Sequence, residues 1–234
     1  MAAELAMAAI LVVAASALLV GLTLRIVLYA RTPAPLPLAT TPAPTGRVGA
    51  ALRVGREIVL FPSLWGADKP LWLAAMLFHL GLALVLARHL RYVIEIPPAW
   101  VVALQGPGQL GGILMMAGLV LLGLRRTLIR RVRKISRPTD YGWLLLLLLI
   151  GGSGLAMTYR WHTDIIGLKA FLAGLWRLDL VPLPGDPALI AHMVLAAALI
   201  ALLPVSKLLH GFALVFSPSR ASPDSTRLGE RRHG

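Results

Sequence analysis

Four histidines occur inside apolar stretches of this chain. His79 and His89 lie ten residues apart in "PLWLAAMLFHLGLALVLARHLRY", and His192 and His210 begin and end "HMVLAAALIALLPVSKLLH". On one continuous helix, the eighteen residues from His192 to His210 make about five full turns, so both rings would point the same way. His79 and His89 would lie about 15 Å apart and differ by about 80° in direction. Ionisable residues inside a membrane are rare and usually functional.

Imidazole pairs at such positions have three possible uses: holding an iron between two rings, relaying protons, or joining helices by a polar contact. The chain contains no cysteine. This excludes disulfides, thiolate zinc sites, iron–sulfur clusters and covalently attached c-type haem within it. A redox metal would therefore need histidine, carboxylate or methionine ligands. His162 and His233 lie outside the apolar stretches and are interpreted as surface residues.

The composition is that of a polytopic membrane protein, because 58% of the 234 residues are hydrophobic and only 14% are charged. We predict an all-α fold with five transmembrane helices in a haem-binding bundle. The five apolar stretches cover 5–30, 70–93, 108–125, 141–160 and 187–212. The basic residues Arg25 and Arg31 lie at the end of the first stretch instead of before it, which predicts a retained anchor and not a cleaved signal peptide.

The net charge of +13 is concentrated in segments 31–69 and 124–138 and in the C-terminal tail. By the positive-inside rule these segments face the cytoplasm, which places the N-terminus outside and the C-terminus inside the cell inner membrane. Membrane topology thus explains the charge, and nucleic-acid binding is rejected because no aromatic-interleaved soluble surface accompanies it.

Four domains are predicted. Residues 1–30 form an N-terminal anchor helix, and 31–69 form a cytoplasmic proline-rich linker followed by an amphipathic helix over 47–61. Residues 70–215 form a four-helix di-haem domain, and 216–234 form a cytoplasmic basic tail. Within 161–186 we expect a further interfacial helix and turn on the outer side.

The predicted topology makes the second and fifth spans antiparallel. His79 and His210 then lie near the cytoplasm, and His89 and His192 near the outer face. Two such pairs on two helices favour bis-histidine haem. The levels match imperfectly, because the two histidines are separated by about 15 Å on one helix and about 27 Å on the other. Helix tilt, or a kink at Pro204, would absorb part of this difference. Small residues such as Gly81 would leave room for a macrocycle, but they equally suit tight helix packing.

The histidine-bearing segments resemble a known family. "FHLGLALVLARHLRY", followed by "AHMVLAAALIALLPVSKLLHGF", is similar to the gamma subunit of respiratory nitrate reductase, a five-span di-haem cytochrome b. "SLWGADKPLW", "ARHLRYVIE", "ISRPTDYGWLLLLLLIGGSGLAM" and "FSPSRASPDSTRLGERRH" are similar to DsrM, the cytochrome b of the Dsr membrane complex in sulfur-oxidising and sulfate-reducing prokaryotes. These segments favour a DsrM-type protein, with a nitrate reductase gamma subunit as the alternative.

The resemblance implies two haem b groups, one bound by His79 and His210 on the cytoplasmic side and one by His89 and His192 on the outer side. It also implies a quinone, either menaquinone or ubiquinone, beside one haem. Arg88 and Arg91 are the candidates for that quinone site, although they would equally suit haem propionates or lipid headgroups.

The implied function is electron transfer between the quinone pool and a cytoplasmic iron–sulfur subunit of the DsrK type, in dissimilatory sulfur metabolism. The chain itself is expected to be an electron-transfer subunit of an oxidoreductase complex. The basic segment "RRTLIRRVRKISR" is a candidate docking site for the partner, or else an anchor to anionic lipid. A different class of function is a haem-free anchor or proton-relay subunit, in which the four histidines carry protons.

Overall fold

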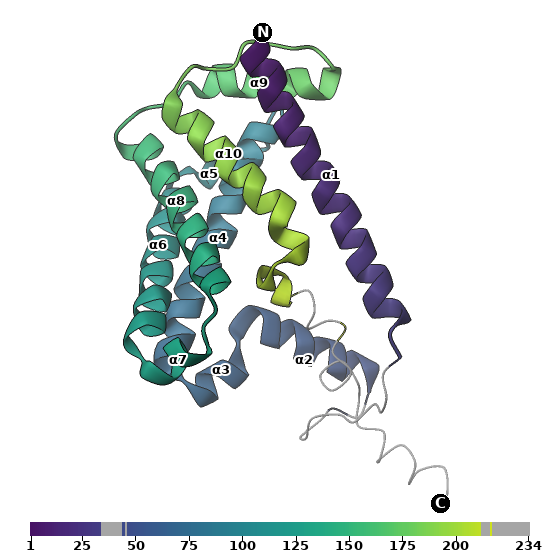
Figure 1. Ribbon diagram of the computed structural model, residues 1–234, viewed down its shortest axis with the longest axis vertical. Helices are drawn as coiled ribbons and strands as arrows, with labels where there is room; N and C mark the ends of the chain where they lie inside the picture. The colour runs from purple at the N-terminus through teal and green to yellow at the C-terminus, as the bar shows by residue number, and fades with distance from the viewer. Residues whose placement is uncertain (34–43, 45, 212–215, 217–234) are drawn as a thin grey trace, which may run out of the picture. The chain divides into compact units, whose positions relative to one another are not determined.

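The computed structural model describes residues 1–33, 44, 46–211 and 216, and this described part is helical without strands. The helices are α1 (Ala2–Arg31), α2 (Arg47–Leu60), α3 (Pro62–Ala67), α4 (Lys69–Val93), α5 (Ala99–Ala103), α6 (Gln105–Leu128), α7 (Arg130–Ile135), α8 (Pro138–Tyr159), α9 (Ile165–Arg177) and α10 (Pro187–Leu202) (Figure 1). Five segments are long and apolar enough to cross a membrane: α1, α4, α6, α8 and Pro187–Val205. The prediction of an all-α protein with five membrane-spanning helices is confirmed.

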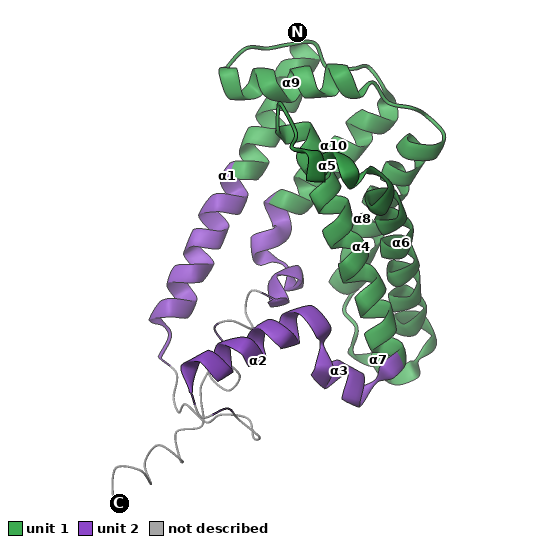
Figure 2. Ribbon diagram, turned by 180° about the vertical axis from the view of Figure 1, so that it is seen from behind, with its two compact units in different colours: residues 1–15, 70–200 green, residues 16–69, 201–234 purple. Residues whose placement is uncertain are grey.

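The chain divides into two compact units (Figure 2). Unit 1 consists of Met1–Ala15 and Pro70–Ile200, and unit 2 of Ser16–Lys69 and Ala201–Gly234. His79, His89 and His192 belong to unit 1, whereas His210 belongs to unit 2. The predicted domain boundaries stay a prediction.

Helices α4 and α6 of unit 1 approach each other closely because glycines of each helix lie against the backbone of the other. A Cβ atom added at Gly81 of α4 would lie 2.4 Å from the backbone nitrogen of Met115 on α6. One added at Gly118 of α6 would lie 2.5 Å from the backbone nitrogen of Phe78 on α4. In membranes such small residues allow backbones to come into contact and to gain dispersion energy along their length. Helix α8 runs beside α6 in both views (Figures 1 and 2).

Helix α9 contributes Leu168 and Phe171 to a buried apolar cluster of unit 1. The Asp164 side chain begins the helix by accepting hydrogen bonds from the backbone nitrogens of Ile166 and Gly167, both at 3.0 Å. Phe171 is fully buried. It belongs to a cluster with Met7 of α1, Leu168 of α9, and Leu189 and Met193 of α10. The helix expected within 161–186 is therefore confirmed, and its outer-side location stays a prediction.

The amphipathic helix expected over 47–61 is present in unit 2 as α2. Its Ala50 and Val54 side chains are buried, whereas Val48 and Leu52 are exposed. Its location along the cytoplasmic membrane surface stays a prediction. Most of the proline-rich linker and nearly all of the basic tail, with His233, lie outside the described residues.

One sequence prediction about the fifth span is wrong. The expectation that the His192 and His210 rings point the same way assumed a continuous helix, but α10 ends at Leu202 and two short 3-10 turns follow, over Leu203–Val205 and Lys207–Leu209. The break lies at Pro204, which has no N–H for the helix ladder and whose ring clashes with the preceding turn. The argument that His192 and His210 point the same way required an unbroken helix, so it no longer applies.

The break at Pro204 is stabilised by the second half of α1. A Cβ atom added at Gly21 would lie 2.5 Å from the Pro204 ring, so glycine permits the close approach. Arg25 donates a hydrogen bond from Nε to the Pro204 carbonyl oxygen at 3.1 Å. Ser206 then caps the second turn by accepting from the Leu208 backbone nitrogen at 3.1 Å. Arginine and serine thus satisfy backbone groups near the break.

Candidate functional site

The structure brings His89 and His192 together inside unit 1. Their ring centroids lie 6.3 Å apart, and the ring planes differ by only 17°. A metal ion lies about 2 Å from each imidazole nitrogen that binds it, so two rings that share one ion stand roughly 6 Å apart between centres. The pair therefore has the separation that bis-histidine ligation requires. The ring of Tyr92, one turn along α4, contacts the His89 ring edge-on with centroids 5.5 Å apart.

All four histidines direct Nδ1 to a hydrogen-bond partner. His79 contacts the Ala75 carbonyl oxygen at 2.8 Å and His89 the Val85 carbonyl oxygen at 2.7 Å. Carbonyl oxygen only accepts, so Nδ1 of these two rings carries the proton and the lone pair is on Nε2. Metal-binding histidines are usually oriented in this way, with the second nitrogen donating to a carbonyl, a carboxylate or water.

His192 and His210 follow the same pattern. Nδ1 of His210 contacts the Lys207 carbonyl oxygen at 3.2 Å. Nδ1 of His192 contacts the Ser153 hydroxyl oxygen of α8 at 2.9 Å. Ser153 was not predicted as a site residue, although a hydroxyl between glycines in a leucine-rich span indicates a polar contact inside the membrane.

The pairing of His79 with His210 stays a prediction. His79 lies on α4 in unit 1, where its ring meets the Phe78 ring edge-on with centroids 4.9 Å apart. His210 follows the second 3-10 turn of unit 2 and lines a pocket of 270 Å³ together with Arg25, Tyr29, Pro204, Ser206, Lys207 and Leu209. Two cationic side chains beside a histidine would suit a ligand that carries carboxylates.

A porphyrin fits this donor set better than a bare metal ion. Within the described residues no group of three or more histidine, cysteine, aspartate or glutamate side chains comes together. Protein-only metal sites need three or four ligands, whereas the iron of a porphyrin takes only its axial ligands from the protein. Two imidazoles at the His89–His192 separation are sufficient for that role.

Arg88 and Arg91, the predicted quinone-site residues, converge on Gln105 at the start of α6. Nε of Arg88 donates to Gln105 Oε1 at 3.4 Å, and Nη1 of Arg91 donates to the same oxygen. The guanidinium of Arg91 also lies 5.3 Å from the centre of the Tyr92 ring. Gln105 was not identified from the sequence, because a single amide at the edge of a span carries no spacing signal.

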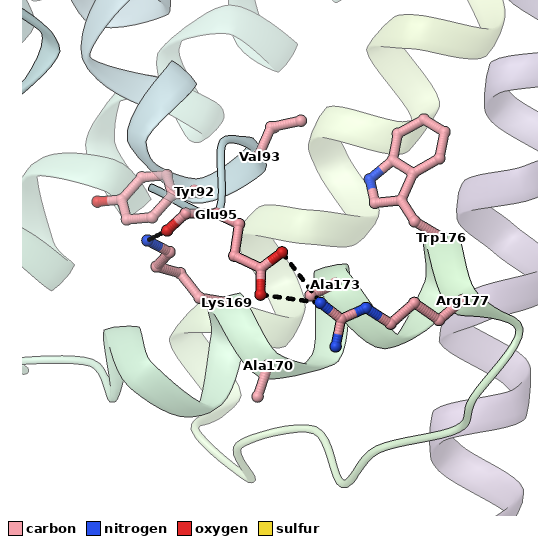
Figure 3. A pocket seen from close by; sticks show the side chains of 8 residues that line it. All are labelled: Tyr92, Val93, Glu95, Lys169, Ala170, Ala173, Trp176 and Arg177. Atoms are coloured by element: carbon pink, nitrogen blue, oxygen red, sulfur yellow. Dashed lines mark hydrogen bonds and ion pairs between the residues drawn. The ribbon is translucent and has the colours of Figure 1, made fainter. Parts of the chain in front are cut away.

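A pocket of 480 Å³ lies between the end of α4 and α9 (Figure 3). Its lining includes Tyr92, Lys169, Trp176 and the ion pair of Glu95 with Arg177, whose Nη2 donates to the two carboxylate oxygens at 2.8 and 3.0 Å. Lys169 donates from Nζ to the Glu95 carbonyl oxygen at 3.1 Å. The volume lies within the range of about 300–1,000 Å³ typical of small-molecule sites. Tyr92 connects this pocket to the His89 ring.

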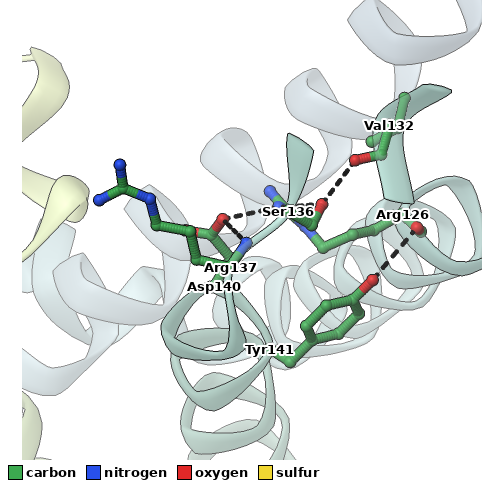
Figure 4. A network of polar contacts seen from close by, with 6 residues as sticks. All are labelled: Arg126, Val132, Ser136, Arg137, Asp140 and Tyr141. Atoms are coloured by element: carbon green, nitrogen blue, oxygen red, sulfur yellow. Dashed lines mark hydrogen bonds and ion pairs between the residues drawn. The ribbon is translucent and has the colours of Figure 1, made fainter. Parts of the chain in front are cut away.

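The basic segment between α6 and α8 is organised by a polar network (Figure 4). Nη1 of Arg126 lies 3.2 Å from an Asp140 carboxylate oxygen and donates to the Ser136 hydroxyl at 2.9 Å. Tyr141 donates its hydroxyl to the Arg126 carbonyl oxygen at 3.4 Å. Arg126 therefore has a structural role. Five other basic residues of the segment are exposed: Arg130, Arg131, Arg133, Lys134 and Arg137.

The family model described as "Nitrate reductase gamma subunit" matches residues 63–219, a stretch that contains α4 to α10 and all four membrane histidines. The chain belongs to the nitrate reductase gamma subunit family. Family and helices together make it a multi-pass membrane protein.

Three curated proteins are similar to this member of the nitrate reductase gamma family. Two are named "Hdr-like menaquinol oxidoreductase cytochrome b-like subunit". The protein from Archaeoglobus fulgidus is 36% identical over 178 residues, or 70% of this chain and 53% of its own length. That from Archaeoglobus profundus is 28% identical over 264 residues, or 92% of this chain and 77% of its own length. The "Nitrate reductase gamma chain" of Bacillus subtilis is 31% identical over 166 residues, or 62% of this chain and 74% of its own length.

The chain thus spans about half the length of the Archaeoglobus fulgidus relative. No solved structure matches it.

Proposed function

We propose that this chain is a DsrM-type cytochrome b, which holds two haem b groups and transfers electrons between the quinone pool and a cytoplasmic iron–sulfur subunit of the DsrK type. The observation that carries the proposal is the His89–His192 pair, with near-parallel rings 6.3 Å apart. His79 and His210 would hold the second haem, on the cytoplasmic side. Haem b, when bound, supplies reversible one-electron chemistry.

The chain's own residues would hold and orient the haems. Each histidine would present Nε2 to the iron, because Nδ1 is engaged in a hydrogen bond. In unit 2, Arg25 and Lys207 would face the haem carboxylates beside His210. The buried Nη1 atom of Arg53 on α2 has no hydrogen-bond partner in the described part of the chain. A buried guanidinium nitrogen of this kind favours a nearby anionic group.

A quinone site beside the outer haem is supported by the polar residues around Tyr92. Arg88, one turn before Tyr92, and Arg91, directly before it, both donate to Gln105, and Tyr92 itself lines the 480 Å³ pocket. A quinone oxygen requires a hydrogen-bond donor or proton acceptor close to the membrane interface. The names of the Archaeoglobus relatives support menaquinol as the quinone substrate.

The exposed basic surface of α7 would face the cytoplasm and the iron–sulfur partner, in an inner membrane with the N-terminus outside. The similarity to the Bacillus subtilis protein supports a second candidate, the gamma subunit of a nitrate reductase. Copurification separates the two: an iron–sulfur protein of the heterodisulfide-reductase type supports the first candidate, and a molybdenum protein supports the second.

The decisive experiment is a reduced-minus-oxidised spectrum of the purified chain, with pyridine haemochrome quantification per polypeptide. We expect about two haems b per chain, reduced on addition of a menaquinol analogue. A purified chain without a Soret band would overturn the cytochrome proposal and would leave the histidines as proton carriers or structural contacts.

A further inference from the structure

His192 differs from the other three membrane histidines in the acceptor that its Nδ1 atom contacts. His79, His89 and His210 use a backbone carbonyl three or four residues earlier in their own segment. His192 uses the Ser153 hydroxyl of α8, 39 residues away in the chain, at 2.9 Å. One histidine is therefore oriented by another membrane-spanning helix.

The direction of this hydrogen bond follows from the second contact of Ser153. A serine hydroxyl has one proton, and Ser153 donates it to the Ile150 carbonyl oxygen of its own helix at 3.0 Å. The Ser153 oxygen must then accept from Nδ1 of His192. The imidazole is held as the tautomer that carries its lone pair on Nε2.

The His192 ring also lies close to Gly154 of α8. Gly154 follows Ser153, and a Cβ atom added there would lie 3.4 Å from Cε1 and 3.8 Å from Nδ1 of His192. The small surface of α8 at this level therefore lies against the imidazole while the neighbouring hydroxyl binds its nitrogen. The His89 ring, which is nearly parallel to that of His192, lies 6.3 Å from it between centroids.

We propose that Ser153 is a positioning residue that sets the orientation and basicity of His192 as a haem ligand. This inference rests on the proposed function. Hydrogen-bond partners of ligating histidines fix the ring and raise its basicity, and their loss typically weakens metal binding about 10–100-fold. Because the Ser153 hydroxyl already donates its hydrogen bond to the Ile150 carbonyl oxygen, it can act on His192 only as an acceptor.

The test compares Ser153→Ala with Ser153→Thr in the purified full-length chain. Threonine keeps the hydroxyl and should retain the wild-type behaviour. The matched control is Thr158→Val, since Thr158 lies on the same helix and its hydroxyl donates to the Gly154 carbonyl oxygen of that helix at 3.0 Å. Haem content, the low-spin electron paramagnetic resonance spectrum and the midpoint potential of each haem are measured.

In Ser153→Ala we expect a shift in the low-spin signal and midpoint potential of one haem, with the other unchanged. Loss of the Ser153 acceptor makes the His192 imidazole a weaker electron donor to the haem iron. This favours the reduced iron and raises the midpoint potential of that haem. A tenfold change in the one-electron equilibrium corresponds to about 59 mV. The same haem should dissociate about tenfold more readily in detergent.

Each outcome has a distinct meaning. If Ser153→Ala keeps the wild-type haem content, spectrum and midpoint potential, the role of Ser153 is overturned. An equal change in Thr158→Val would overturn it as well. Both outcomes leave the proposed function intact. A wild-type chain without haem would overturn both. If Ser153→Ala does not fold, Ser153→Cys is measured instead. Its thiol is a weaker acceptor, so the same haem must shift in the same direction by a smaller amount.

Discussion

Asp140 and Glu95 each pair with an arginine, but their surroundings differ. The Asp140 side chain is only 8% exposed; it lies 3.2 Å from Arg126 and accepts a hydrogen bond from the Arg137 backbone nitrogen at 2.9 Å. It therefore caps the start of α8 while it neutralises a half-buried guanidinium. Glu95 and Arg177 are 70% and 64% exposed, so water screens their attraction.

We expect Asp140→Asn to lower the free energy of unfolding by about 1–3 kcal/mol, because hydrogen bonds to charged groups are worth about that much when buried. Glu95→Gln should change it by about 0–1 kcal/mol, as for other exposed ion pairs. Thermal unfolding of the two variants in the same detergent provides the comparison. Equal losses of stability would contradict the structural role assigned to the Asp140 network.

At the residue scale, the sequence identifies side chains of a type that is unusual in an apolar span. Histidines in apolar spans are conspicuous, and the topology predicted that His89 and His192 would lie at the same level. Their ring centroids lie 6.3 Å apart, and their role as haem ligands stays a prediction. Ser153 and Gln105 were not identified. Their roles depend on which residue of another helix lies opposite, and helix rotation is set by packing, which a single sequence does not specify.

At the scale of helices, the close packing of α4 against α6 depends on a glycine, Gly118 of α6. A Cβ atom at Gly118 would lie 2.5 Å from the Phe78 backbone nitrogen and 2.8 Å from the Ala74 carbonyl oxygen. Backbone atoms cannot rotate away as side chains do, so the helices would have to separate. Gly152 of α8 is a suitable control because a Cβ atom there meets nothing within 4 Å.

We expect Gly118→Ala to destabilise the protein by about 1–3 kcal/mol through overpacking. Gly152→Ala should instead stabilise it by about 0.4–1 kcal/mol, because alanine reduces the conformational entropy of the unfolded chain. Midpoints of thermal unfolding in detergent should therefore move in opposite directions. A stability of Gly118→Ala at or above that of the wild type would show that α4 and α6 are not in backbone contact.

At the element scale, the apolar runs predicted the number of spanning helices but not the end of the last one. Apolar residues continue beyond Pro204, at Val205, Leu208 and Leu209, so composition alone extended the fifth span to residue 212. Proline inside a span is tolerated when neighbours satisfy the freed backbone groups. Here Arg25 binds the Pro204 carbonyl oxygen and Gly21 gives its ring room, and both residues belong to a helix far away in the sequence.

For the whole molecule, the charge distribution predicts which loops face the cytoplasm. Arg131 on α7 and His162 after α8 are both exposed, and a single spanning helix, Pro138–Tyr159, separates them. If α8 crosses the membrane, the two positions must lie on opposite sides. The positive-inside rule further assigns Arg131 to the cytoplasm and His162 to the outside.

The absence of cysteine allows a direct test of this topology, because Arg131→Cys and His162→Cys would each introduce one thiol into an otherwise thiol-free chain. In spheroplasts, a membrane-impermeant maleimide should label His162→Cys and leave Arg131→Cys unlabelled, whereas disrupted membranes should give labelling of both. The unsubstituted chain provides the blank. The reverse pattern would invert the orientation and place the histidine pair of α4 and α10 nearer the cytoplasm. Labelling of both variants in intact spheroplasts would mean that α8 does not span the membrane.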